Sequence, residues 1–229
     1  MRSYKTLFFM ALLITSQLHS MAQNSTDKWD NELWTGARLV MGQSKWIYSV
    51  EYQTRFSQDM RQLDRWYLEG AARYLAGNHF EIVPDFRYSI RTSANECRFG
   101  TGVIYKTMFK RLRFINQFKA QIDIPVGKST SYGIRNIIYF NYLLNEKWTP
   151  YIGGGPLYRI GERYTGFEVI RFGGGFHYKI DPKHLVSLNY YVGSRDTGEE
   201  ILWNGVLFIQ FTFTLNKEFR YVPAKTIDF

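Results

Sequence analysis

The chain has 229 residues, a formal net charge of +9 and a single cysteine, Cys97. One cysteine excludes an intramolecular disulfide, and this length suits one all-β domain. The basic residues alternate with other residues and form no run, so the positive charge does not indicate nucleic-acid binding.

The first 22 residues are typical of a secretory signal peptide. Arg2 and Lys5 flank the start of the chain, the apolar run TLFFMALLIT follows, and small residues up to Ala22 suit cleavage. The run is too short for a transmembrane helix. We therefore expect an exported protein whose mature part, residues 23–229, forms one domain.

Alternation of apolar and polar side chains, typical of half-buried strands, recurs along the rest of the chain. In KWIYSVEYQTRF, residues 45–56, the side chains of Trp, Tyr, Val and Phe share one face, and those of Glu51 and Arg55 share the other. We expect antiparallel strands joined by hairpins. In chain order they lie at 32–42, 45–56, 65–76, 79–91, 96–106, 111–124, 131–144, 148–160, 163–180, 184–195 and 205–215, with longer connections at 57–64, 124–131 and 194–204.

The tail 218–229 predicts a twelfth strand, because Phe219, Tyr221, Ile227 and Phe229 share one parity. Single-chain bacterial barrels usually have an even number of strands. We therefore expect an up-and-down barrel of about 10–12 strands and prefer twelve. A ten-stranded barrel starting at residue 45 is the alternative.

These strands predict a transmembrane barrel in a bacterial outer membrane. They are about 10–14 residues long, against roughly five to six in soluble proteins. Aromatic residues make up 18% of the chain and often lie near strand ends, as in interfacial girdles. Those near strand ends are Trp34, Trp46, Trp66, Tyr105, Trp148 and Trp203. Such a barrel would contact lipids and be inserted by the barrel-assembly machinery. A soluble periplasmic lipocalin-like binding barrel remains the alternative.

The polar parity predicts a charged, arginine-rich lumen. These side chains would either pair and plug the interior or line a narrow pore that admits small anionic solutes. The predicted lumen network consists of Arg38, Glu51, Arg55, Glu69, Arg73, Glu81, Asp85, Arg87, Glu96, Arg98, Arg111, Arg113, Lys119, Asp123, Arg135, Arg171 and Lys179.

A lipid-active barrel enzyme is a second functional class, in which a His and a Ser two residues apart share one outward face. His184 and Ser187 lie three residues apart, hence on opposite faces of a strand, and His177 has no serine in reach along its strand. An acidic loop with Asp196, Glu199 and Glu200 is better explained by solvation than by cation binding. We therefore predict no enzyme, no catalytic or metal-binding residues and no cofactor.

Several motifs resemble an uncharacterised family of outer-membrane β-barrel proteins common in the Bacteroidota. They are ELWTGARLVMGQSKWIYSVEYQTRF, FRYSIR, WTPYIGGGPLYR, RFGGGFHYKI and NYYVG, and they span most of the mature chain. The resemblance implies the fold and the location, and it implies no activity or catalytic residues.

Overall fold

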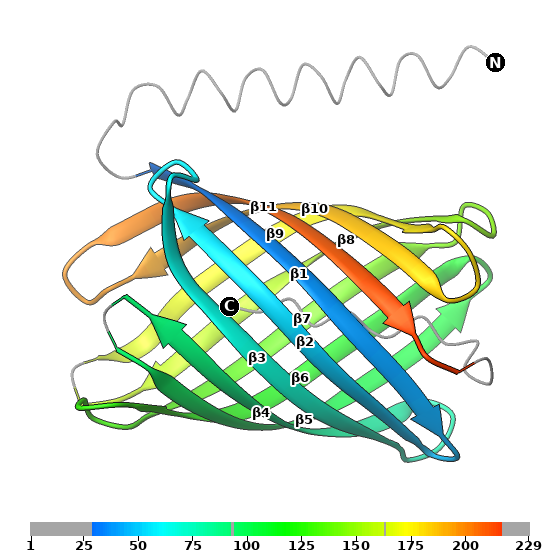
Figure 1. Ribbon diagram of the computed structural model, residues 1–229, viewed down its shortest axis with the longest axis horizontal. Helices are drawn as coiled ribbons and strands as arrows, with labels where there is room; N and C mark the ends of the chain where they lie inside the picture. The colour runs from blue at the N-terminus through cyan, green and yellow to red at the C-terminus, as the bar shows by residue number, and fades with distance from the viewer. Residues whose placement is uncertain (1–28, 93, 163, 217–229) are drawn as a thin grey trace, which may run out of the picture.

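In a computed structural model, which describes residues 29–92, 94–162 and 164–216, every regular element is a strand (Figure 1). Across these residues no helix is long and apolar enough to cross a membrane. Alternating β-branched and aromatic residues favour this extended backbone. The strands are β1 (Trp29–Gln43), β2 (Trp46–Ser57), β3 (Gln62–Leu75), β4 (Phe80–Arg91), β5 (Glu96–Phe109), β6 (Leu112–Pro125), β7 (Ser131–Tyr142), β8 (Trp148–Ile160), β9 (Thr165–Lys179), β10 (His184–Asp196) and β11 (Ile201–Thr214).

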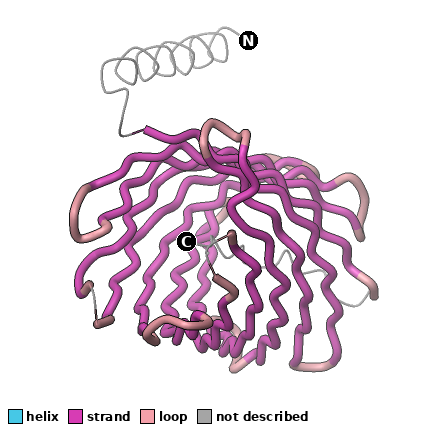
Figure 2. The backbone as a smooth tube through the Cα atoms, turned by 60° about the vertical axis from the view of Figure 1, so that its left-hand side comes forward, coloured by secondary structure: helices cyan, strands magenta, loops and turns pink. Residues whose placement is uncertain are grey.

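The eleven strands form one closed barrel in which each strand pairs with its neighbours in the chain (Figure 2). Consecutive strands are antiparallel, whereas β1 and β11 close the barrel as a parallel pair, with Trp34 opposite Phe208. The prediction of an all-β closed barrel is therefore confirmed, and the strand number falls within the expected range.

The preferred number of twelve strands differs from the eleven observed. Because β1 pairs directly with β11, no edge between them remains for a twelfth strand. The residues assigned to that strand, 218–229, lie outside the described residues, as does the signal peptide at 1–22. With an odd number of strands, β1 begins at one rim of the barrel and β11 ends at the other.

The three longest predicted connections are shorter in the structure than the sequence predicts. The segment 194–204 was expected to be a loop, but pairing of β10 with β11 continues as far as Asp196 opposite Ile201. The hairpin ladder therefore extends into residues whose polar composition resembles a loop. Similarly, β3 begins at Gln62 and β6 ends at Pro125.

The two faces of the wall differ in chemistry. Along β7 the side chains alternate between buried and exposed, so that Arg135 and Ile137 face the interior while Ile134 and Ile138 face outward. The outer face carries aliphatic and aromatic side chains, and the interior contains most of the charges. This is the reverse of a soluble globular protein, which buries its apolar surface.

Glycines in β8 and β9 make room for tyrosine rings inside the barrel. Gly153 and Gly173 lie opposite each other, and a Cβ on either would approach a tyrosine Cδ1 atom to 2.7 Å, that of Tyr139 or Tyr191 respectively. The absence of a side chain therefore lets both rings lie against the wall.

Candidate functional site

The structure buries most of the predicted lumen charges inside the barrel. Thirteen of the seventeen are buried: Arg38, Glu51, Arg55, Glu69, Arg73, Glu81, Arg87, Glu96, Arg98, Lys119, Asp123, Arg135 and Arg171. The side chain of Asp85 is also buried, at 4% exposure, although its backbone is more accessible.

Three predicted lumen side chains are not buried. Arg111 is exposed in the two-residue turn between β5 and β6, where strand alternation no longer applies. Lys179 is the last residue of β9 and is exposed, because the strand has already reached the rim. Arg113 is half-buried near the start of β6.

Ion pairs between neighbouring strands fill the interior beneath β1 to β6. Arg38 and Glu51 lie opposite each other on β1 and β2 with side chains 5% and 6% exposed. The Nε of Arg87 donates to Glu69 at 3.0 Å across β3 and β4. Cross-strand register thus converts alternating charges into buried pairs. The other pairs between neighbouring strands are Arg98–Asp123 and Lys106–Glu81, whereas the pair Lys119–Asp85 joins β6 to β4 across the inner face of β5.

Beneath β8 to β10 the interior contains an aromatic and amide cluster that sequence reasoning missed. The hydroxyls of Tyr151 and Tyr191 are 2.5 Å apart, and Tyr151 also donates to Asn189. His177 stacks on Tyr151 with ring centroids 4.7 Å apart. The only sequence signal for this cluster is its inward parity.

His177 also contacts Ser187, which lies opposite it on the adjacent strand. Its Nδ1 is 2.8 Å from the serine Oγ, and both residues are buried. A search for partners along a single strand cannot find such a cross-strand pair. The other histidine of this hairpin, His184, contacts Asp181 in the β9–β10 turn at 2.6 Å. The hydrogen bond from His184 lowers the pKa of Asp181 below its ordinary value.

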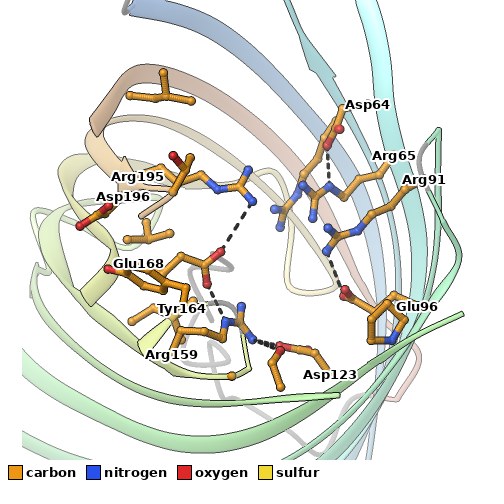
Figure 3. Close-up of a pocket in the computed structure, with 18 of the residues that line it drawn as sticks. Asp64, Arg65, Arg91, Glu96, Asp123, Arg159, Tyr164, Glu168, Arg195 and Asp196 are labelled. Carbon is orange, nitrogen blue, oxygen red and sulfur yellow. Dashed lines mark hydrogen bonds and ion pairs between the residues drawn. The ribbon is translucent and has the colours of Figure 1, made fainter. Parts of the chain in front are cut away.

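A cavity of about 560 Å³ opens at the rim where β1 begins, and we call it the funnel (Figure 3). The connections that follow β2, β4, β6, β8 and β10 surround its mouth. Eight basic and eight acidic residues line it. The basic ones are Arg55, Arg65, Arg91, Arg98, Lys128, Arg159, Arg171 and Arg195, and the acidic ones are Asp30, Glu32, Asp64, Glu96, Asp123, Glu162, Glu168 and Asp196.

Ion pairs on the funnel wall form two groups that face each other in Figure 3. On one side, Arg159 donates to Glu168 at 2.6 Å and also pairs with Asp123. On the other side, Arg91 donates to Glu96 at 2.9 Å. At the mouth, partial burial and a hydrogen bond to Asp196 raise the pKa of the Tyr164 hydroxyl.

The floor of the funnel, formed by Trp34, Arg55 and Arg171, is one end of a row of alternating guanidinium and aromatic groups. Arg171 lies 4.8 Å and Arg55 3.7 Å from the ring centre of Trp34, while Arg55 and Arg87 lie 5.4 and 4.0 Å from that of Tyr67. Such contacts contribute about 0.5–2 kcal/mol each. Trp34 is 1% exposed and points inward, so its assignment to an interfacial girdle is wrong.

The acidic loop is organised by its own backbone. Asp196 accepts a hydrogen bond from the backbone N–H of Gly198 at 2.8 Å, an arrangement typical of a solvated turn. Within the described ranges, no three His, Cys, Asp or Glu side chains are grouped closely enough to hold a metal ion.

Comparison with protein-family models gives a match over residues 31–201 to a protein family of unknown function, DUF2490. The chain belongs to this family. The match begins at the third residue of β1, covers β2 to β10 in full and reaches the first residue of β11. A comparison with curated proteins gives no match.

Proposed function

We propose that this DUF2490 protein is an outer-membrane β-barrel whose lumen is closed by side chains and open only as a funnel at one rim. The observation that carries the proposal is the apolar outer face. Each of the eleven strands presents at least one large exposed hydrophobic residue, including Leu39, Val50, Leu68, Phe86, Phe99, Phe118, Ile138, Ile152, Phe172, Tyr190 and Phe211.

A continuous apolar belt is unfavourable in water, because monomeric soluble proteins seldom expose patches beyond a few hundred Å². In a bilayer the same belt contacts acyl chains, and closure of the sheet satisfies the backbone hydrogen bonds. Tryptophans flank the belt at both rims, as interfacial anchors do: Trp46 and Trp148 are 39% exposed at one rim, and Trp203 is 49% exposed at the other.

Packing at mid-height supports a closed lumen over an open channel. Gln53, Tyr67, Ile104, Ile137 and Tyr191 project inward from five strands, and each has an exposure of 0%. Side chains that are this inaccessible fill the space through which a solute would pass. We propose a barrel with a structural or solute-binding role, inserted by the barrel-assembly machinery.

The test uses the full-length chain expressed in a Gram-negative host. We expect the protein to fractionate with the outer membrane and its unboiled form to migrate differently on a gel from the boiled form. In planar bilayers, we expect no steady conductance. Recovery of the protein in the soluble periplasmic fraction would refute the membrane location. Stable unitary conductance in planar bilayers would refute the closed lumen.

A further inference from the structure

We propose that the funnel floor binds a small organic oxyanion, a carboxylate or phosphate compound, with Arg55 as the anchor. The inference goes beyond the proposed membrane role and requires only the folded barrel. It rests on a buried cation that forms no ion pair with the described residues, on the bonding of the funnel carboxylates, and on the size of the cavity.

Arg55 is a buried cation that forms no ion pair with any carboxylate among the described residues. It is 3% exposed, yet within the described part of the chain its Nε has no hydrogen-bond partner and its Nη2 reaches only Gln53, at a long 3.5 Å. Removing a charge from water without pairing it is costly. Stacking on Trp34 offsets part of that cost, and an anion in the funnel would offset the rest.

Although acidic and basic residues are equal in number in the funnel, their hydrogen-bonding groups are not equally occupied: the carboxylates are bonded, whereas the Arg55 guanidinium has a donor that the described residues leave unused. Each of the eight carboxylates already accepts a hydrogen bond or pairs with a cation. The partners include Arg65 for Asp64, Arg195 for Glu168, the indole N–H of Trp34 for Glu32 at 2.7 Å, and backbone N–H groups for Asp30 and Asp196. Glu96 and Asp123 pair with arginines, and Glu162 accepts from Ser129. An incoming anion therefore meets satisfied carboxylates and the donor group of Arg55.

The shape of the site defines the class of ligand. A guanidinium binds planar carboxylate and phosphate oxygens through two parallel hydrogen bonds. Arg171 also borders the floor and adds positive charge beside Trp34. The funnel volume of about 560 Å³ falls within the range of about 300–1,000 Å³ for small-molecule sites.

The mouth of the funnel adds hydroxyl groups that suit a polar ligand body. Ser129, Thr130, Ser131 and Tyr164 line the cavity away from the floor. Hydroxyls both donate and accept hydrogen bonds, so they can contact the neutral polar groups of a bound solute. A small hydroxylated organic anion would therefore place its oxyanion on Arg55 and its hydroxyls toward the mouth.

The test measures binding to the purified full-length barrel in detergent. Citrate and glycerol phosphate are titrated by calorimetry and tryptophan fluorescence, with chloride holding the ionic strength constant. We expect saturable binding that Arg55→Gln weakens at least tenfold. The matched control, Arg111→Gln, removes the same charge from an exposed turn at the opposite rim and is expected to change affinity less than twofold.

Heat-modifiable migration verifies that each variant is folded. If Arg55→Gln does not fold, Arg55→Lys replaces it; that variant keeps the charge, loses the planar fork and is expected to weaken binding at least threefold. Three results would each overturn the proposal. They are wild-type affinity in a folded Arg55 variant, an equal loss of affinity in Arg111→Gln, and a binding signal for citrate and glycerol phosphate that is no larger than the signal for chloride alone. None of these results bears on membrane location, which the fractionation experiment tests separately.

Discussion

Replacing Phe118 by lysine tests whether the outer face contacts lipid. Phe118 lies at the middle of β6 and is 47% exposed on the outer face. Phenylalanine carries roughly 200 Å² of surface, so about 100 Å² faces outward. At ~25 cal/mol per Å², removing that contact with acyl chains costs about 2.5 kcal/mol. This value agrees with the loss of about 2–4 kcal/mol for lysine at a bilayer midplane.

Leu112→Lys is the matched control, because Leu112 begins the same strand, has the same outward parity and is 40% exposed. Close to an interface, lysine is expected to cost at most about 1 kcal/mol. The assay is equilibrium urea unfolding in phospholipid vesicles, followed by the gel shift between folded and unfolded forms. Phe118→Leu controls for lost packing against the wall. Equal unfolding free energies for the two lysine variants would refute a lipid-facing belt.

Three further predictions concern the interior and one turn. Glu69→Gln leaves its buried guanidinium partner on β4 without a full counter-charge, so it is expected to lower the free energy of unfolding in urea by about 3–5 kcal/mol. Gly173→Ala is expected to cost about 1–3 kcal/mol by denaturant titration, because the new Cβ would lie 2.2 Å from a backbone oxygen. In the same assay Gly70→Ala is the control and should change stability by less than about 1 kcal/mol, since no atom of the described residues lies within 4 Å of its Cβ position. By NMR titration, Asp181 should have a pKa below its ordinary value, and His184→Ala should raise it, because the imidazole hydrogen bond is the largest cause of the shift.

The pH dependence of the contribution of Asp181 to stability follows from thermodynamic linkage. Because the folded-state pKa of Asp181 is lowered, its contribution to stability is present above the unfolded-state pKa and is lost as the pH falls through the folded-state pKa. An unchanged Asp181 titration in His184→Ala would contradict this assignment. For the interior, stability close to wild type in Glu69→Gln, or equal effects at Gly70 and Gly173, would contradict the packing described above.

Local alternation made the closed barrel and most of its lumen charges predictable, because strand parity alone decides which face a side chain occupies. The same rule fails where a strand ends, which explains why Arg111 and Lys179 are exposed instead of buried. It also cannot identify partners on neighbouring strands. The contact between His177 and Ser187 depends on the register of β9 against β10, which no pattern within one strand contains.

The parallel pairing of β1 with β11 is another feature of strand register that alternation within one strand does not specify, and it contributes to the proposed binding site. Pairing of Trp34 with Phe208 brings the two rings into an edge-on contact, with centroids 6.0 Å apart. Arg171 reaches the indole from β9 and Arg55 reaches it from β2, so Trp34 joins cations from both sides of this strand pair. In a twelve-stranded barrel another strand would separate β1 from β11, and Phe208 and Arg171 would lie farther from Trp34, whereas Arg55 would still reach it from the adjacent β2. The contribution of Arg171 to the funnel floor therefore depends on the odd strand number, which hydrophobic alternation along the chain does not specify.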